Sequence, residues 1–479
     1  MTDTRAVEPL DRVAEIEARS AAFRRELGLA TLALTQIMYV VGSGWVGTAA
    51  KLGPSHVIFW SAAILLYYLP QAAVVIYLNR LMPLEGGLYQ WATEGLGKFL
   101  GFLTAWNLWA YSIAVMAVFG VVIATNLAYL LTPMGVTFTK AAWYTPVVSS
   151  AAVVVLSFVS LLGLRVGKWL QGIGGWSQIL MFSALIAVPY VALSRGTAHA
   201  YHPLHWAMPS LTLLSVNIFG KMALGALSGF EYVAILAGEC RAPSKTIGQS
   251  VLIATPVIAV MFIFGTSSVL ALVPQNQIDL VSPIPQALQI GFAGLGVARF
   301  IVPALIVMLL ARQIGNVTLI FAGNTRLPMV AGWDRLVPAW FTRLHPRYRT
   351  PYNSILFVGA LTLVLTLLGQ VGVGLQEAYQ LIENAAGIFY AFTYLALFAI
   401  PLFGAQRLGV TPPLWLRVMS ASGFAVSLLY SVLSVFPIID VASWQIFAVK
   451  IISVLVIANV IGVAIYRAGL RRAAAAHRE

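Results

Sequence analysis

The stretch QIMYVVGSGWVGTAA, residues 36–50, is apolar enough for a helix that crosses a membrane, yet it carries the small residues GSG at its centre, 42–44. A second apolar stretch, KMALGALSGFEYVA at 221–234, is interrupted in the same way by GALSG at 225–229. Glycine weakens a helix and lets a ligand approach the backbone closely. Two interrupted helices in corresponding places therefore predict a small-molecule site between them, near the midplane of the membrane.

The composition agrees with a membrane setting. Of 479 residues, 60% are hydrophobic and only 9% are charged, whereas an ordinary soluble domain has about 45–50% and about 25%. So few charges cannot cover the surface of a water-soluble globule, which excludes a soluble enzyme, a disordered chain and a secreted disulfide scaffold. The single cysteine, Cys240, provides no internal disulfide and no thiolate metal cluster.

Long apolar segments set the expected fold. A transmembrane helix needs about 20 mostly apolar residues, and the sequence predicts twelve such helices. They lie near 29–50, 56–79, 99–131, 142–163, 170–194, 210–238, 249–273, 298–326, 353–371, 378–404, 415–438 and 443–466. Because the segments are continuously apolar rather than alternating, they favour helices over a barrel. The expected fold class is an all-α polytopic membrane protein with twelve transmembrane helices.

Basic residues set the expected direction of these helices. With the N-terminus inside, most of the 29 Lys and Arg residues fall on the cytoplasmic side, above all in the tails 1–28 and 467–479 and the loop 327–352. The positive-inside rule then predicts a multi-pass protein of the cell inner (plasma) membrane with both termini cytoplasmic. The net charge of +13 is interpreted as this orientation signal, so membrane lipid is an expected partner and nucleic acid is not.

The spacing of the two interruptions predicts internal symmetry. They fall in the first and the sixth predicted helix, an odd number of helices apart, so the second set of five helices would cross the membrane in the opposite sense. We expect a first five-helix repeat at 29–194, an inverted repeat at 210–404, and two further transmembrane helices at 415–466.

A broken helix presents unpaired backbone groups. Amide N–H groups are exposed where its outer half begins, and carbonyl groups are exposed where its inner half ends. The N–H end attracts a carboxylate and the carbonyl end attracts an ammonium, so two facing breaks suit a zwitterionic amino acid. The alternative is that the small residues only let helices pack closely.

Five charged residues lie well inside predicted helices, where charge is costly and usually marks a pathway, a relay or a pair. They are Lys221, Glu231, Arg312, Glu383 and Lys450. Glu231 directly follows the second interruption and has three candidate roles: binding a cationic group, exchanging a proton, or satisfying the backbone of the broken helix. Arg312 and Glu383 are candidates for a buried pair, and Lys450 is a candidate for contact with another helix or subunit.

Aromatic and histidine residues each allow two interpretations. Trp106, Trp109 and Tyr111 of the third predicted helix either gate the substrate path or pack in the core. His199, His202 and His205 are evenly spaced, as in some metal sites, but their loop offers no acidic or cysteine partner. We therefore expect no metal site and no cofactor.

Several short stretches combine into a more specific pattern. They are Gly42-Ser43-Gly44; Glu85-Gly86-Gly87 with Tyr89 and Trp91; Gly229-Phe230-Glu231 running on to Gly238-Glu239-Cys240-Arg241-Ala242-Pro243; and Arg326, Asp334, Pro338, His345-Pro346 and Thr350-Pro351. In their order and placement they resemble the amino acid–polyamine–organocation (APC) superfamily, bacterial amino acid permease type, over about residues 25–410.

The resemblance implies a secondary active transporter on the LeuT-like 5+5 inverted-repeat fold, which moves amino acids by alternating access. It places the substrate carboxylate at Ser43 and the amide of Gly44, and the ammonium at the carbonyls of Val40, Gly225 and Ser228. The full set of expected binding residues is Val40, Val41, Gly42, Ser43, Gly44, Gly225, Ser228, Gly229 and Glu231, with Trp106, Trp109, Phe230 and Glu383 as gate or pocket residues.

Two positions depart from the family pattern. Gly225 stands where many relatives have a bulky aromatic gate, so the pocket would be roomier, or gated by Trp106 or Trp109. Gln178 aligns with a lysine of some proton-coupled relatives, which favours substrate exchange, although Glu231 remains a candidate proton carrier. The expected function is therefore proton symport or substrate exchange, with an amino acid and, in symport, H⁺ as partners.

Other functions stay open at this point. A polyamine or cationic amino acid transporter or antiporter would use Glu231 and Glu383 to bind the extra positive charge. A polytopic membrane enzyme would need His, Asp or Glu clustered near an interface, whereas the carboxylates of the inner loops are scattered, so we expect no enzymatic activity. A channel is less favoured because the sequence shows no filter-like loop.

Overall fold

The computed structural model describes the chain in segments. They are 28–82, 87–131, 136–161, 164–196, 201–230, 243–325, 340–341, 343–348 and 350–476. Ten helices in these segments are long and apolar enough to cross a membrane, and one bent helix pair adds an eleventh span. The described segments contain no strand. The prediction of an all-α polytopic membrane protein is confirmed.

The sixth predicted helix, 210–238, is described only as far as Phe230. The described part contains the shorter apolar helix Leu213–Ala226. The residues 231–242, which include Glu231, lie outside the described part of the chain. Eleven of the twelve predicted helices are thus among the described spans, and the remaining one, the sixth, is described in part.

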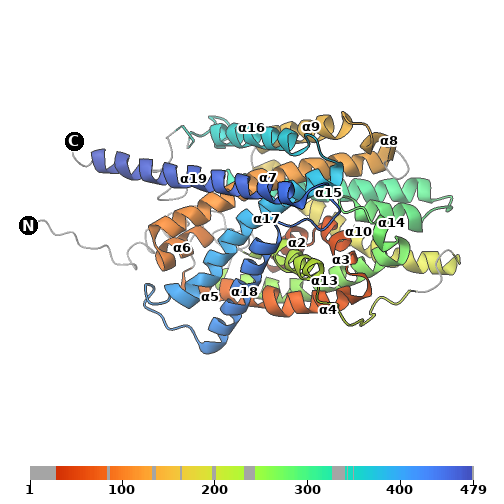
Figure 1. The fold of residues 1–479 in the computed structure, drawn as a ribbon, viewed down its shortest axis with the longest axis horizontal. Coiled ribbons are helices and arrows are strands. Elements are labelled where there is room, and N and C mark those ends of the chain that lie inside the picture. Colours follow the sequence, from red (N-terminus) through yellow and green to blue (C-terminus); the bar gives the residue numbers. More distant parts are fainter. Residues whose placement is uncertain are drawn as a thin grey trace, which may run out of the picture.

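The elements follow one another along the chain as labelled in Figure 1. They are α2 (Leu29–Val40), α3 (Ser43–Ala50), η1 (Gly53–Ser55), α4 (His56–Ala63), η2 (Ile64–Tyr68), α5 (Leu69–Leu81), α6 (Leu88–Leu96), α7 (Lys98–Leu131), α8 (Val136–Thr139), α9 (Tyr144–Leu161), α10 (Leu164–Ser194), α11 (Leu213–Gly220), η4 (Lys221–Ala226), α13 (Pro243–Leu272), η6 (Gln275–Gln277), α14 (Pro283–Gly291), α15 (Ala298–Asn324), α16 (Tyr352–Gly369), α17 (Leu375–Ala399), η8 (Ile400–Gly404), α18 (Leu414–Leu433) and α19 (Trp444–Ala476).

The two broken spans lie within the helix bundle. α7 packs along α17, and α10 packs along α15. Among these helices, α2 contacts α10, α13 and α15, while α3 contacts α13, α14 and η4. The contact between α3 and η4 brings the break of the first span next to the break of the sixth.

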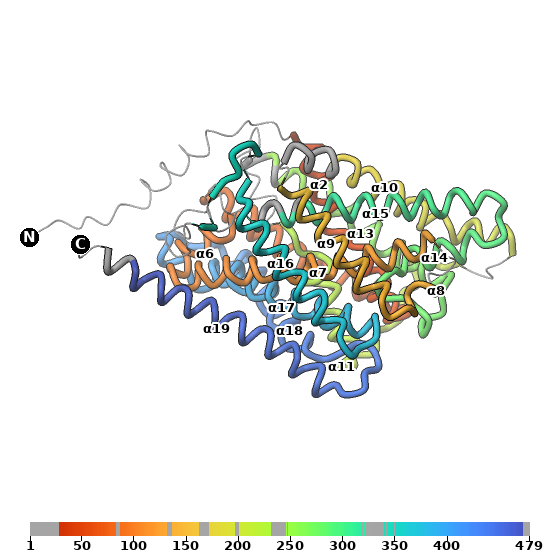
Figure 2. The backbone as a smooth tube through the Cα atoms, turned by 90° about the horizontal axis from the view of Figure 1, so that it is seen from above, coloured from red at the N-terminus to blue at the C-terminus, as the bar shows by residue number. Residues whose placement is uncertain are grey.

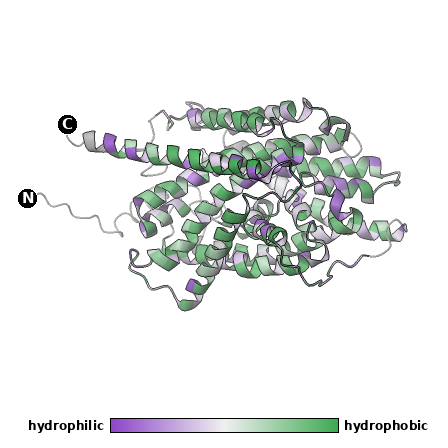
Figure 3. Ribbon diagram, in the orientation of Figure 1, coloured by the Kyte–Doolittle hydropathy of each residue, from purple (hydrophilic) through white to green (hydrophobic). Residues whose placement is uncertain are grey.

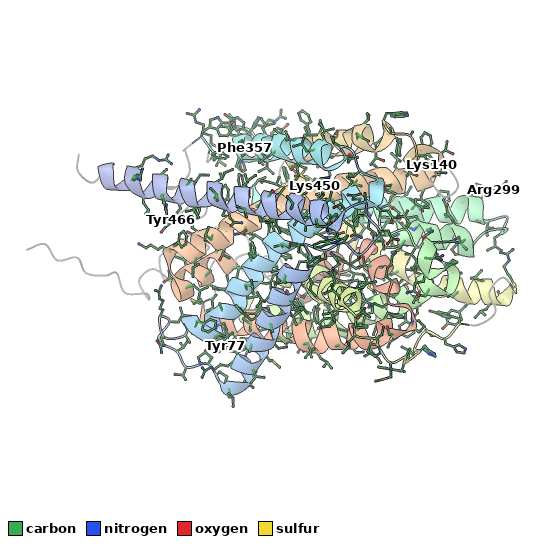
Figure 4. All side chains as sticks on the ribbon, viewed as in Figure 1. Tyr77, Lys140, Arg299, Phe357, Lys450 and Tyr466 are labelled. Carbon is green, nitrogen blue, oxygen red and sulfur yellow. The ribbon has the colours of Figure 1, made fainter. Side chains whose placement is uncertain are left out.

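Other helices cover this centre. α9 packs on α7 and α16, and α19 runs along the edge of the bundle (Figure 2). Hydrophobic residues extend along the outer helices (Figure 3), and on α19 Val456 and Val460 are exposed, as a lipid-facing surface requires. Lys450 is also exposed on α19. Lys140 and Arg299 lie toward one end of the molecule (Figure 4).

Candidate functional site

Span one is broken where the sequence predicts. α2 ends at Val40, the residues Val41 and Gly42 leave the helical conformation, and α3 begins at Ser43. The two halves are bent by 47°. Because the Gly42 N–H turns back to Val40 O at 2.9 Å, the last carbonyls of α2 and the first N–H groups of α3 are left without partners inside their own helices.

Two buried side chains from other spans bind the carbonyl end of α2. Arg312 of α15 donates through Nη2 to Val41 O at 2.8 Å and to Met38 O at 3.3 Å. Gln178 of α10 donates through Nε2 to Val41 O at 2.9 Å. Both side chains are almost completely buried. The negative end of this half-helix is therefore compensated by protein groups.

The N–H end of α3 is narrow and polar. Ser43 is buried, and its Oγ accepts from Gln313 Nε2 at 3.5 Å, a long and weak hydrogen bond. A Cβ at Gly44 would lie 2.8 Å from Tyr379 Oη, so a larger residue requires that ring to move. The first turn of α3 thus offers a hydroxyl and backbone N–H groups to a ligand in a confined space.

Span six is broken at Ser228 and Gly229, after the wide turn 221–226. Gly229 has φ +133°, a conformation that residues with side chains rarely adopt. Its N–H donates to Tyr394 Oη at 2.8 Å, and Ser228 Oγ is hydrogen-bonded to Tyr67 Oη at 2.8 Å. Tyrosines from the second and tenth spans therefore fix the backbone of this break.

Gln71 of α5 completes the second break. In the amide orientation that gives both its nitrogen and its oxygen a hydrogen-bond partner, the nitrogen donates to Leu227 O at 3.0 Å and the oxygen accepts from Phe230 N at 3.2 Å. The same oxygen accepts from Tyr394 Oη at 2.7 Å. This fully buried amide takes up backbone groups that the break leaves unpaired, a role that the sequence suggested for Glu231.

Trp45 is a site residue that the sequence analysis missed. A Cβ at Gly225 would lie 2.4 Å from Cη2 of its ring, and a Cβ at Gly42 would lie 2.6 Å from Cδ1. The indole ring therefore fits against the glycines of both breaks. The aromatic group beside Gly225 therefore comes from span one. Trp45 directly follows the GSG interruption, and this position in the sequence could have indicated a residue of the site.

A cavity of about 110 Å³ lies between the two breaks. Residues of the breaks line one side: Val40, Gly42, Ser43, Gly44, Trp45, Gly225, Ala226 and Ser228. Neighbouring helices contribute mainly apolar and aromatic residues, Tyr39, Tyr111, Val115, Val118, Phe119, Val122, Ile320, Ala386, Gly387 and Tyr390, together with the polar residues Arg312, Gln313, Asn316, Tyr379, Glu383 and Tyr430. One water needs about 10–15 Å³, so the cavity has room for a small molecule.

Two predicted binding residues lie in the breaks without lining the cavity. Val41 presents its carbonyl to Arg312 and Gln178, and Gly229 presents its N–H to Tyr394. Gln178, predicted as a coupling residue, thus contacts the backbone of span one rather than the cavity.

Of the predicted aromatic gate residues, Tyr111 lines the cavity, whereas Trp106, Trp109 and Phe230 do not. Trp106 donates through Nε1 to Ala458 O at 2.9 Å, which ties α7 to α19. Trp109 stacks on Phe357 with ring centroids 6.0 Å apart. Phe230 packs in the core against an aromatic ring of span two. Their observed positions match the packing interpretation, while a gating role stays a prediction.

The charged residues at the cavity have separate partners. Glu383 is hydrogen-bonded to Tyr379 and experiences the charge of Lys221. Lys221 donates to Asn384 Oδ1, whereas Arg312 binds the carbonyls of α2. The hypothesis of an Arg312–Glu383 pair is therefore wrong: the cation close to Glu383 comes from span six, because the α2 carbonyls engage the arginine.

The family model for amino acid permeases matches residues 27–466 of the chain. This chain belongs to the amino acid permease family. The match spans nearly all of the described helices, and it confirms the resemblance to the APC superfamily that the short stretches indicated.

Individual relatives share about a quarter of their residues with this permease. The branched-chain amino acid permease BcaP of Bacillus subtilis is 24% identical over 408 residues, which are 80% of this chain and 81% of BcaP. The probable agmatine/putrescine antiporter AguD of Lactococcus lactis is 24% identical over 280 residues, 56% of each chain. Among solved structures, MhsT in complex with L-phenylalanine matches with a TM-score of 0.60 at 14% identity, covering 86% of this chain and 98% of MhsT. That likeness shows a LeuT-like fold.

Proposed function

We propose that this permease is a secondary active transporter that moves amino acids across the cytoplasmic membrane by alternating access, as a proton symporter or a substrate exchanger. The observation that carries the proposal is the cavity between the two broken spans, with the N–H end of α3 on its wall. In transporters of this architecture, substrates bind near the midplane where broken helices meet.

The polarity of the breaks suits a zwitterion. The substrate carboxylate would bind Ser43 and the N–H of Gly44, because the first turn of a helix favours negative charge. The ammonium would bind the carbonyls of Val40, Gly225 and Ser228. The carbonyl of Val41, one of the predicted ligands, is a poorer candidate because protein side chains already bind it.

The rest of the cavity favours an uncharged side chain. Tyr111, Val115, Val118 and Phe119 of α7 line the cavity together with Ile320 of α15. Apolar walls stabilise apolar substrate groups by roughly 25 cal/mol per Å² removed from water. BcaP is a branched-chain amino acid permease, and the crystal structure of MhsT contains L-phenylalanine, which agrees with this proposal.

A polyamine or cationic amino acid carrier is the second candidate, because the relative AguD is a probable agmatine/putrescine antiporter. Such a substrate needs a free carboxylate. Glu383, the one carboxylate that lines the cavity in the described part of the chain, already has a hydroxyl partner in Tyr379 and the charge of Lys221 nearby. Because these neighbours already stabilise the charge of Glu383, its carboxylate attracts a second cation less strongly. The amino acid transporter is therefore favoured over the polyamine or cationic amino acid carrier.

The topology belongs to the same proposal. We propose the five-helix repeats at 29–194 and 210–404, with 415–466 outside them, in a plasma membrane that leaves both termini in the cytoplasm. Because the family and the relatives are transporters, we propose transport without enzymatic activity.

The test is uptake by purified protein in liposomes. Labelled leucine and alanine should enter, and they should do so faster than labelled arginine or putrescine. Dependence on a pH gradient would assign symport, whereas dependence on internal unlabelled amino acid would assign exchange. Saturable uptake of arginine or putrescine alone, lost in Glu383→Gln, would replace the proposal by the cationic one.

The variant Gly44→Leu tests the position of the site. Leucine at this position meets Tyr379 at the mouth of α3, so we expect the loss of leucine binding in a thermal-shift assay while the protein stays folded and inserted. The control is Gly248→Leu, where an added Cβ meets only Ile76 at 3.8 Å and binding should persist. Normal binding by Gly44→Leu would move the site elsewhere.

A further inference from the structure

Glu383 and Tyr379 lie one helical turn apart on the face of α17 that lines the central cavity. Glu383 is the one carboxylate in that lining within the described part of the chain. The hydroxyl of Tyr379 donates a hydrogen bond to it. Because a phenol has a single proton to donate, an ionised Glu383 uses the donor capacity of Tyr379 completely.

The same hydroxyl lies at the first turn of α3. A Cβ at Gly44 would be 2.8 Å from Tyr379 Oη, and this turn is where the proposed function places the substrate carboxylate. Tyr379 Oη therefore lies between Glu383 and the expected position of a second carboxylate. With Glu383 ionised, two negative charges would compete for one donor in a confined site, which is unfavourable.

One proton resolves this competition. A protonated Glu383 has an O–H of its own that can donate to Tyr379 Oη, and the phenol O–H is then free to donate to the substrate carboxylate. In this step the carboxylate of Glu383 takes a proton from hydronium, and water is released. We propose that Glu383 is the proton-binding residue of this permease and takes up one proton with each amino acid that binds. The inference rests on the proposed function and selects symport over exchange within it.

The two cations near this carboxylate are already engaged. Lys221 of η4 is close enough for its charge to act on Glu383, and its ammonium donates to Asn384 Oδ1. The guanidinium of Arg312 binds the carbonyls of α2. The other titratable groups of the lining are phenols, which are neutral near pH 7: Tyr39, Tyr111, Tyr379, Tyr390 and Tyr430. Within the described lining, Glu383 is therefore the group that can change its charge when a substrate carboxylate arrives.

The proton has a route from the extracellular side of the proposed topology. Asp279, in the loop before α14, lines a second cavity of about 1270 Å³. The other charged residues of that lining are Lys51, Glu377 and Asp440. The charge of Asp279 also acts on Tyr379, so Tyr379 stands between this outer cavity and Glu383. The proton and the amino acid would then enter from the same side, as symport requires.

The first test measures proton uptake by the unaltered protein. Purified permease in a weakly buffered detergent solution with a pH indicator is titrated with leucine at about pH 7. We expect up to one proton to be taken up per leucine bound. The leucine affinity should rise as the pH falls from about 8 to about 6, by no more than about tenfold per pH unit for one proton, because each ligand strengthens the binding of the other. Unchanged affinity across this range, with no proton taken up, would overturn the inference.

The second test neutralises the residue. Glu383→Gln keeps the size of the side chain and mimics the protonated acid, so the leucine affinity should lose its pH dependence and leucine binding should take up no proton. A pH gradient across liposomes should then no longer drive leucine accumulation. Glu377→Gln removes a carboxylate from the first turn of the same helix. It is the matched control and should keep the pH dependence and the proton uptake.

The outcomes separate this inference from the proposed function. If leucine binds and exchanges with no proton taken up, the permease is an exchanger and this inference alone fails. If proton uptake persists in folded Glu383→Gln protein, another group carries the proton, and its loss in Glu231→Gln would assign that role to Glu231. If the unaltered protein binds no amino acid at any pH, the proposed function fails. The first test uses no variant, so it decides even where Glu383→Gln does not fold.

Discussion

At the scale of single residues, Trp45 determines how much of the central cavity is open. Its ring would lie within 3 Å of a Cβ at either Gly42 or Gly225, so each glycine makes room for the indole. Trp45 also lines the cavity beside the apolar residues of α7. The size of the substrate side chain that fits should therefore depend on this ring.

Trp45→Ala should enlarge the cavity and shift specificity. We expect the preference for phenylalanine over alanine, measured as the ratio of the two inhibition constants against labelled leucine, to rise about tenfold, since one added methylene in an apolar pocket changes affinity by about 10–200-fold. Trp176→Ala, which removes an exposed tryptophan of α10, is the matched control. An unchanged ratio in folded Trp45→Ala protein would show that the ring does not limit the substrate.

At the scale of elements, each break depends on side chains from other spans. Arg312 and Gln178 bind the end of α2, while Gln71 and Tyr394 bind the backbone around Gly229. Unpaired backbone groups are costly where water is excluded. A broken helix in a membrane therefore requires partners on its neighbours, and glycine in its own sequence is only part of the requirement.

Gln71→Leu tests this dependence. Leucine has a similar size but leaves Leu227 O and Phe230 N without the amide, at a cost of about 1–3 kcal/mol for each buried group. We expect a lower melting temperature in detergent and weaker leucine binding. Gln445→Leu, at an exposed position of α19, should have neither effect. If Gln71→Leu melts and binds like the unaltered protein, the amide does not stabilise the break.

At the scale of the whole molecule, a chain of polar contacts links the loop before α14 to the break of span one. Ser282 Oγ donates to Asn126 Oδ1 at 2.7 Å, Asn126 Nδ2 donates to Gln313 Oε1 at 3.0 Å, and Gln313 Nε2 reaches Ser43 Oγ at 3.5 Å. The contacts join α7 and α15 to the extracellular side of the proposed topology. We expect these contacts to hold that side of the molecule together.

Asn126→Leu removes the middle member of this chain of polar contacts and should make the cavity more accessible from the outside. We expect a cysteine introduced by Val118→Cys, in a Cys240→Ser background, to react several-fold faster with a thiol reagent added outside the cell, because breaking the chain shifts the population toward an outward-open state. Thr139→Leu, on the short helix α8, serves as the control. Equal labelling rates with and without the Asn126→Leu substitution would show that the polar chain does not control access.

The sequence predicts the elements of this molecule better than their contacts. The long apolar segments and the two glycine clusters are properties of continuous stretches, so the spans and the break of span one could be located without a structure. The contacts of Trp45 with Gly225 and of Arg312 with Val41 join residues far apart in the chain. Such pairings depend on how helices pack, and for this reason Arg312 was paired with Glu383 and Trp45 was not predicted to lie beside Gly225.

An experimental density map of the permease with a bound amino acid would show whether the substrate binds between the two broken spans. We expect the ligand between the two breaks, with its carboxylate at Ser43 and Gly44 and its ammonium near Gly225 and Ser228. Density for the ligand at any other place, or an empty cavity under saturating concentrations that support transport, would contradict it.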